Sequence, residues 1–185
     1  MVDSKDNREF EIVECNDQNS ILVKKLKEWA KGSDECSHFY SLWSRFKNWE
    51  NKNAHLYILI SEDYEIAGMN AFTCNKRNPY INCYYFEIDE KFRRLGLGNK
   101  LFYSCIEEGK ENGNTRLTLR TKFNSLGMKF YNHIGMKERY FDPKTKENIF
   151  DFNISNINSV KGISEKLNDT PHKSRLKIYE KYEKL

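Results

Sequence analysis

The sequence of 185 residues lacks any apolar run of the roughly 18 to 20 residues that a membrane span requires. Its polar beginning, MVDSKDNREFE, contains no signal-peptide core. The cysteines are odd in number and form no C-x-x-C pair, so neither a disulfide framework nor a metal site is predicted; they lie at positions 15, 36, 74, 83 and 105. We therefore expect a cytoplasmic protein without a membrane partner.

Alanine is also scarce and occurs only at positions 30, 54, 67 and 71. Aromatic residues, 14% of the chain, must therefore supply much of the packing of a single core. We expect one domain over residues 8–154. Residues 155–185 form a basic extension, with seven Lys and Arg against four Asp and Glu. This extension is expected to be one or two helices, which cover the sheet, pair with a second copy in a homodimer, or stay mobile.

Apolar periodicity alternates between the strand and helix patterns along the chain. Helices are expected from a cap at Asn19 or Ser20 to Gly32, over His38–Trp49, from Gly98 to about Asn112, and in the stretch SLGMKFYNHIGMKER. Strands are expected at Phe10–Cys15, Leu56–Ser61, Ile66–Cys74, Ile81–Asp89, Arg116–Arg120, Met136–Phe141 and Ile149–Ile154. The interior Gly68 indicates a bulge, a close backbone approach, or simple tolerance of glycine.

A basic turn with two glycines joins the strand at Ile81–Asp89 to the following helix. Its residues, Arg93-Arg94-Leu95-Gly96-Leu97-Gly98, place unpaired helix N–H groups and positive charge at one point, which suits a diphosphate. Lys100 adds a further positive charge. The alternative is that the turn merely begins a solvated helix. No Gly-Lys-Ser/Thr follows, and the pattern is one residue short of G-x-G-x-x-G, so P-loop and Rossmann sites are excluded.

A second pattern follows in a fixed order, with a strand, Asn124, Phe130-Tyr131 and Gly135-Met136. Together with the Arg-x-x-Gly-x-Gly turn, it resembles the GNAT superfamily of acetyl-CoA dependent N-acetyltransferases, in which Phe usually stands at the position of Met136. The resemblance covers roughly Phe10 to Ile154. It implies an α/β (α+β) fold with one mixed, mostly antiparallel sheet of about six to seven strands flanked by helices.

The resemblance also implies how acetyl-CoA binds as co-substrate. The main chain of Ile88, Asp89 and Glu90 would pair with the pantetheine arm. Asn124 would contribute on the far side. The diphosphate would lie against the turn and the first helical residues, which are Arg93, Arg94, Leu95, Gly96, Leu97, Gly98 and Asn99. The reaction needs no metal or prosthetic group.

Direct acetyl transfer to an amine needs a base for the amine and an acid for the departing thiolate. The resemblance makes Tyr131 the candidate acid, with simple packing in a helix face as its alternative. Some relatives carry a glutamate early on the strand before the turn, but Asn82 stands there and cannot act as a base. Glu87 is the candidate base, with a salt-bridge role as its alternative. His55 and His133 are weaker candidates because a lone histidine carries little information.

The acceptor is expected to be a primary amine: a polyamine, an amino acid or antibiotic, a protein amine, or aminoacyl-tRNA. Nucleic acid is the less favoured partner, because basic residues are usually solvated; those on the first helix are Lys24, Lys25, Lys27 and Lys31. The aromatic stripe of the His38–Trp49 helix either packs on the sheet or lines the acceptor pocket. A second hypothesis is a regulatory or interaction module that binds acyl-CoA without turnover.

Overall fold

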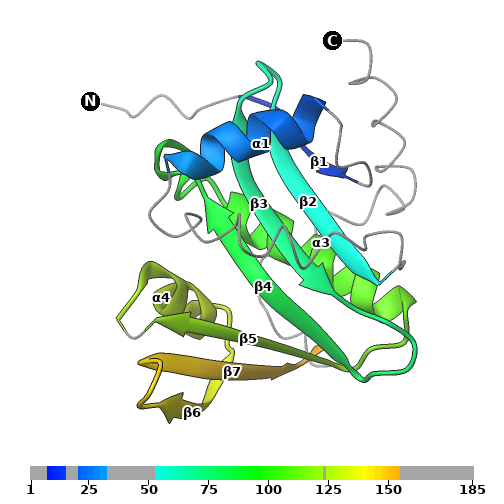
Figure 1. Ribbon diagram of the computed structural model, residues 1–185, viewed down its shortest axis with the longest axis vertical. Helices are drawn as coiled ribbons and strands as arrows, with labels where there is room; N and C mark the ends of the chain where they lie inside the picture. The colour runs from blue at the N-terminus through cyan, green and yellow to red at the C-terminus, as the bar shows by residue number, and fades with distance from the viewer. Residues whose placement is uncertain (1–7, 16–20, 33–52, 123, 155–185) are drawn as a thin grey trace.

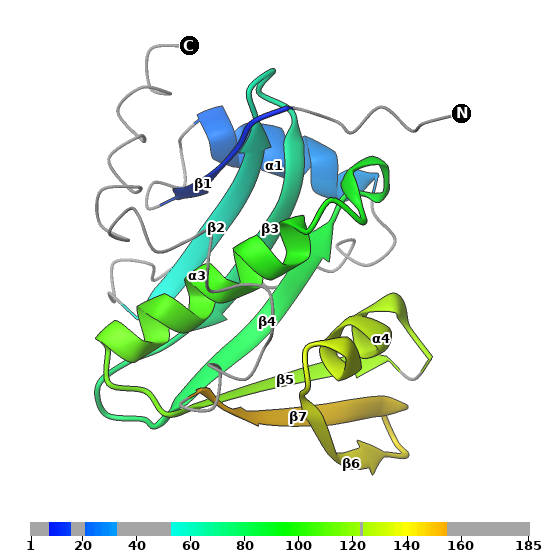
Figure 2. The ribbon, with the colours of Figure 1, turned by 180° about the vertical axis from the view of Figure 1, so that it is seen from behind.

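The structure, a computed structural model, describes residues 8–15, 21–32, 53–122 and 124–154 (Figure 1). These residues form a seven-stranded sheet with α1 on one face and with α3 and α4 on the other (Figures 1 and 2). The helices are α1 (Ile21–Lys31), the short 3₁₀ helix η3 (Glu90–Phe92), α3 (Leu97–Glu111) and α4 (Leu126–His133). The strands are β1 (Phe10–Glu14), β2 (Ala54–Ser61), β3 (Ile66–Thr73), β4 (Tyr80–Ile88), β5 (Arg116–Lys122), β6 (Lys137–Asp142) and β7 (Glu147–Asn153).

This arrangement confirms the expected fold class, a mixed and mostly antiparallel sheet flanked by helices. Each expected strand is present, and its bounds differ from the expected ones by no more than a residue or two. The expected helix His38–Trp49, the capping positions Asn19 and Ser20, and the extension 155–185 lie outside the described residues. None of the described helices combines the length and the apolarity needed to span a bilayer.

The strand order is β1-β2-β3-β4-β5-β7-β6, and every neighbouring pair is antiparallel except β4 and β5. Parallel strands need a crossover connection, and α3 supplies it. The β4–β5 ladder joins Tyr80–Cys83 to Arg116–Leu119 and then ends. Beyond this point the two strands diverge, as Figure 1 shows, so the sheet opens between them.

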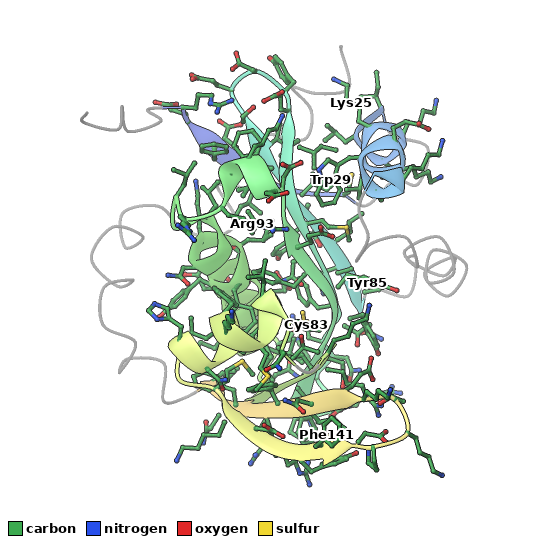
Figure 3. The ribbon with its side chains drawn as sticks, turned by 90° about the vertical axis from the view of Figure 1, so that its left-hand side faces the viewer. Lys25, Trp29, Cys83, Tyr85, Arg93 and Phe141 are labelled. Atoms are coloured by element: carbon green, nitrogen blue, oxygen red, sulfur yellow. The ribbon has the colours of Figure 1, made fainter. Side chains whose placement is uncertain are left out.

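A β-bulge at Tyr84 coincides with the end of this ladder. Phe72 pairs with Cys83 and Ala71 pairs with Tyr85, so Tyr84 is an extra residue on β4. Cys83 packs in the core under α3, whereas Tyr85 packs against the core under α1, and Figure 3 shows them on opposite sides of β4. Regular alternation would have placed both on one face. The bulge thus re-aims the end of β4, and Phe86 and Ile88 pack toward α3.

The structure confirms the close backbone approach predicted for Gly68 and places a β-bulge beside it. Leu59 pairs with Gly68 and Ile60 with Ile66, so Ala67 is the extra residue of the bulge. A Cβ atom on Gly68 would lie 2.6 Å from the carbonyl oxygen of Glu87. The absence of a side chain therefore lets β3 approach the end of β4 closely.

Each face of the sheet has its own apolar core. Under α1, the buried side chains of Leu22, Val23 and Leu26 pack on β2 and β3. Under α3, Leu101, Phe102, Cys105 and Ile106 pack on the other face. Burial of each large apolar side chain stabilises the fold by roughly 1.5–3 kcal/mol. The sheet is therefore packed against helices on both faces.

Candidate active site

The turn between β4 and α3 is fixed by Asp89. Oδ1 of Asp89 accepts a hydrogen bond from the backbone N–H of Lys91 at 3.1 Å, which caps η3. Oδ2 accepts one from Nε1 of Trp29 at 2.8 Å, and Figure 3 shows Trp29 between α1 and the sheet. The carboxylate therefore ties the start of the turn to α1 on the other face of the sheet.

Gly96 is the N-cap of α3 and has a φ of 78°, in the left-handed region. Residues other than glycine are strained there. No heavy atom lies within 4 Å of the position that a Cβ on Gly96 would take. The glycine is required by the backbone conformation, and it leaves open space in front of the helix end.

The first turn of α3 presents N–H groups that have no acceptor within the helix. The N-cap offers no side-chain acceptor, and no acidic residue lies in the first turn. The exposed side chains of Arg93 and Arg94 lie next to it in the chain, and Nε of Arg93 donates to the carbonyl of Ile88 at 3.0 Å. Helix dipole and arginine charge both favour an anion at this point.

A groove of about 340 Å³ runs along this turn. Among the residues predicted to bind acetyl-CoA or to act in catalysis, those that line it are Glu87, Ile88, Arg93, Arg94, Gly96, Gly98 and Asn99. Other predicted residues do not belong to its lining: Asp89, Glu90, Leu95, Leu97 and Asn124. Leu97 instead lies in the apolar core, and Asn124 is exposed with a φ of 57°. Nζ of Lys100 donates to the carbonyl of Phe10, away from the groove.

The opposite wall of the groove comes from α4 and from Phe86, which the sequence reasoning did not include. Phe86 stacks on Phe130 with ring centroids 5.2 Å apart. A Cβ on Gly98 would lie 3.3 Å from the Phe130 ring, so the glycine lets α3 and α4 approach each other. The wall is completed by Leu126, Gly127 and His133. Gly127 gives one sequence signal, because a glycine in a helical pattern often has a packing reason, and a Cβ here would lie 2.9 Å from Oγ1 of Thr121.

A second cavity, of about 230 Å³, lies where β4 and β5 diverge. It is lined from β4 by residues 83–87, from β5 by residues 119–122, and also by Ser125, Gly127, Tyr131 and Glu147. Phe86, Glu87 and Gly127 line both cavities. The two spaces therefore adjoin at the end of β4, and the candidate base Glu87 and the candidate acid Tyr131 line the same cavity.

Tyr131 is fixed in place by the aromatic side chains around it. It is 5% exposed, and its ring centroid lies 5.4 Å from that of Phe130, 5.7 Å from that of Phe150 and 5.9 Å from that of Phe102. A ring held from several sides cannot change its orientation without disturbing its neighbours. The packing role and a catalytic role are thus compatible in one residue.

Glu87 lies on the α1 side of the sheet. It pairs with Met69 across the β3–β4 ladder, and Met69 is fully buried in the core under α1. Cross-strand partners share a face, so Glu87 projects to the α1 side, while Phe86 and Ile88 pack toward α3. Asn82 pairs with Thr118 in the closed part of the β4–β5 ladder and does not line the second cavity.

Cys83 also lines the second cavity, but its environment keeps the thiol protonated. The residue is 8% exposed, and burial raises the pKa of its thiol to about 12. Its Sγ donates a hydrogen bond to Oδ1 of Asn70 at 3.2 Å. Because the thiolate is the nucleophilic form, Cys83 is not suited to attack a thioester.

Comparison with known proteins agrees with this geometry. The family model described as "Acetyltransferase (GNAT) family" matches residues 23–136. No curated protein matches the chain in sequence.

Solved structures share the fold at low sequence identity. A GNAT-family acetyltransferase from Staphylococcus aureus Mu50 is 18% identical with a TM-score of 0.63, and the match covers 79% of this chain and 99% of that one. An acetyltransferase from Streptococcus agalactiae 2603 is 18% identical with a TM-score of 0.59, covering 78% and 98%. The PaiA N-acetyltransferase from Thermoplasma acidophilum, solved with coenzyme A, is 16% identical with a TM-score of 0.57, covering 78% and 99%.

Proposed function

The chain belongs to the GNAT family of acetyltransferases, and from this premise we propose that it transfers an acetyl group from acetyl-CoA to a primary amine. The observation that carries the proposal is that the groove along the turn and the cavity between β4 and β5 share Phe86 and Glu87. A donor in the first space and an acceptor in the second would meet at the end of β4.

In the proposed complex, the diphosphate of acetyl-CoA lies at the first turn of α3. The N–H groups of Leu97, Gly98 and Asn99 face it, with Arg93 and Arg94 as counter-charges. Leu95 and Gly96 shape the turn. The pantetheine arm follows the main chain of Ile88, Asp89 and Glu90 toward the second cavity, and Asn124 contributes from beyond β5. The Thermoplasma acidophilum protein of the same fold was solved with coenzyme A, which supports a coenzyme A thioester as the donor.

The chemistry is a direct transfer between two substrates. The neutral amine attacks the thioester carbonyl, forming the C–N bond and a tetrahedral intermediate. Collapse of this intermediate breaks the C–S bond. Glu87, directly or through a water, takes the proton that the amine loses, and the Tyr131 hydroxyl gives a proton to the departing thiolate. The products are the acetylated amine and free CoA.

The second cavity offers groups that suit an amine acceptor, because the Glu87 carboxylate and the aromatic rings of Tyr84 and Tyr85 line it. Its far side carries mixed charge: Glu147 lies 3.8 Å from Arg120, and Lys122 also belongs to the lining. Carboxylates and aromatic faces both attract ammonium groups.

The described cysteines at positions 15, 74, 83 and 105 are free thiols, in keeping with the proposed cytoplasmic location.

The proposal is tested with the purified full chain. Calorimetric titration measures the binding of acetyl-CoA and of CoA, and mass spectrometry follows a mixed pool of polyamines, amino acids, peptides and aminoacyl-tRNA. We expect binding of both coenzyme forms and an acetyl mass on a pool member. Binding without any product would favour the regulatory acyl-CoA module. No binding would overturn the assignment of the groove.

The role of Glu87 is tested by Glu87→Gln, which keeps the shape of the side chain and removes the basic group. We expect a slower rate at neutral pH that recovers as the pH rises, because more of the amine is then already neutral. The affinity for acetyl-CoA should stay the same. A uniform loss at every pH would indicate that Glu87 positions the strand and does not take the proton.

A further inference from the structure

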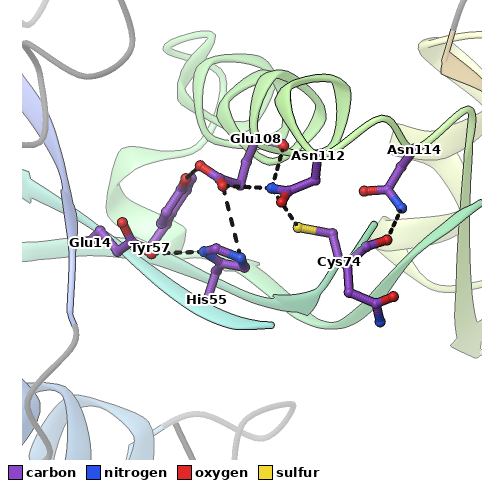
Figure 4. A network of polar contacts seen from close by, with 8 residues as sticks. Glu14, His55, Tyr57, Cys74, Glu108, Asn112 and Asn114 are labelled. Carbon is purple, nitrogen blue, oxygen red and sulfur yellow. Dashed lines mark hydrogen bonds and ion pairs between the residues drawn. The ribbon is translucent and has the colours of Figure 1, made fainter. Parts of the chain in front are cut away.

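A polar cluster lies under the C-terminal end of α3, away from the active site at the N-terminal end of that helix. It consists of His55 on β2, Cys74 just after β3, and Glu108 in the last turns of α3 (Figure 4). One potential ligand atom of each residue lies within 4.8 Å of the other two. Imidazole nitrogen, thiolate sulfur and carboxylate oxygen are all donors that bind zinc in proteins.

His55 offers a nitrogen that has no hydrogen-bond partner. The residue is 8% exposed, and its Nδ1 lies 2.8 Å from Oε1 of Glu14. Its Nε2 is buried without any hydrogen bond, 4.0 Å from Oε1 of Glu108. Although burial lowers it, interactions with Cys74 and Glu14 raise the pKa of His55 to about 10. Nε2 therefore carries a proton in the metal-free protein, and this N–H is directed toward Glu108 and Cys74. Buried polar atoms are normally satisfied, so this orphan atom needs an explanation.

The surroundings hold the other two donor residues in place. The Tyr57 hydroxyl donates to Oε2 of Glu108 at 3.0 Å. Nδ2 of Asn112 donates to Oε1 of Glu108 at 2.9 Å and to Sγ of Cys74 at 3.6 Å. Both acceptor atoms keep further lone pairs, and Oε1 of Glu108 lies 4.0 Å from Nε2 of His55 (Figure 4). Each of the three donors therefore has a supporting contact of its own.

We infer that Nε2 of His55, Sγ of Cys74 and Oε1 of Glu108 form a binding site for Zn²⁺. The contact from Glu14 to Nδ1 of His55 is the carboxylate–histidine arrangement that orients metal-bound imidazoles. Donor atoms around tetrahedral zinc lie about 3.3–3.6 Å apart, given bonds of about 2.0–2.3 Å. The three atoms now lie within 4.8 Å of one another, so the side chains would move closer together when the metal binds. A water completes the coordination, since the Glu108 side chain is 14% exposed.

The ligands neutralise the metal. Zn²⁺ carries two positive charges, the Cys74 thiolate and the Glu108 carboxylate supply two negative ones, and Glu14 adds a further negative charge beside His55. Metal ligands must be deprotonated, so binding releases the thiol proton of Cys74 and any proton on Nε2 of His55. Zinc and protons therefore compete for the same ligand atoms.

Zinc at this point would join β2, the segment after β3 and the end of α3. It would stabilise the sheet–helix contact without touching the groove or the second cavity. The three residues are far apart in sequence and lack any C-x-x-C pair, which is why sequence spacing predicted no metal.

The test uses the full chain after treatment with EDTA. Competition titration with a zinc indicator should give one Zn²⁺ per chain. Cys74→Ser and His55→Gln should each weaken binding by more than about 100-fold, and Glu14→Gln by about 10- to 100-fold, as for other residues that orient metal ligands. Cys83→Ser, a change of the same size at another buried cysteine, should leave the zinc affinity unchanged.

Cobalt gives a second measurement that needs no variant. Co²⁺ added to the wild-type chain should produce a thiolate-to-metal charge-transfer band, which zinc then removes. This spectrum decides the question even if Cys74→Ser does not fold. Absence of stoichiometric zinc binding, a cobalt spectrum without the thiolate band, or equal zinc affinity of Cys74→Ser and the wild type would overturn the inference.

Discussion

Nε1 of Trp29 and Oδ2 of Asp89 form a hydrogen bond of 2.8 Å between α1 and the turn that begins the active-site groove. The two residues come from elements on opposite sides of the sheet. Asp89 does not line the groove itself, although its main chain was predicted to contact the coenzyme. Its side chain caps η3 and so sets where Arg93 and Gly96 lie.

The first prediction concerns this bond. Trp29→Phe removes the donor and keeps an aromatic ring, so it should lower stability by about 1 kcal/mol. If the lost stability affects the conformation of the turn, the affinity for acetyl-CoA should drop by up to about fivefold. Urea unfolding and calorimetry measure the two effects. In a double-mutant cycle, Asp89→Ala should cost less in the Trp29→Phe background than alone; strict additivity would show that the two side chains are uncoupled.

Gly96 allows a matched comparison within one helix. Gly96 and Gly113 flank α3, both have a φ of 78°, and at neither residue does a heavy atom lie within 4 Å of the position that a Cβ would take. Alanine at either site should cost about 1–2 kcal/mol of stability.

Aspartate substitutions should affect acetyl-CoA binding differently at Gly96 and at Gly113. Gly96→Asp should weaken acetyl-CoA binding by at least about 100-fold, because a carboxylate about 4 Å from a phosphate is repelled by about 4 kcal/mol at an effective dielectric constant of 20. Gly113→Asp should leave binding unchanged. Equal acetyl-CoA affinities of the two aspartate variants would show that the diphosphate does not bind at the turn.

Tyr131→Phe removes one hydroxyl from a ring that its neighbours hold in place. We expect kcat to fall by about 10²- to 10⁴-fold, as for loss of a general acid, while the Kd for acetyl-CoA and the Tm stay close to wild type. Tyr103→Phe is the control, since Tyr103 is a partly buried tyrosine of α3 that lines neither cavity. A Tyr131→Phe enzyme with unchanged kcat would assign this residue to packing alone.

The raised pKa of Cys83 leads to a prediction about the reaction path. With a pKa of about 12, about one thiol in ten thousand is ionised at pH 8. Incubation with acetyl-CoA alone should therefore leave no acetyl group on Cys83, and intact-protein mass spectrometry checks this. Initial-rate kinetics should show both substrates bound before CoA leaves. A stable acetyl-protein and a ping-pong pattern would contradict direct transfer.

Much of the fold and of the donor side of the site was predictable because the signals are local. Alternating apolar residues indicated the strands, and the two glycines with their arginines indicated the N-terminal end of α3. Gly96 is informative because the left-handed backbone itself demands glycine. A local pattern of this kind survives in any tertiary context.

The second cavity and the wall formed by Phe86 were not predictable because they depend on long-range register. Tyr84 bulges only relative to its β3 partners, and this bulge decides that Phe86 faces the groove. Likewise, the sequence predicts a coenzyme contact for the main chain of Asp89, but it gives no signal that the carboxylate pairs with a side chain 60 positions away. The cluster of His55, Cys74 and Glu108 forms only when three distant segments are packed together.

The short ladder between β4 and β5 also has a consequence for how the protein opens. Four residue pairs join these strands, whereas β5 and β7 share seven. β5, β6 and β7 with α4 therefore form a part that can detach locally at a lower free-energy cost than global unfolding. Amide hydrogens of the edge strand β6 should exchange with solvent well before those of β2 and β3. The divergence that creates the second cavity is thus also the place where the native state opens locally.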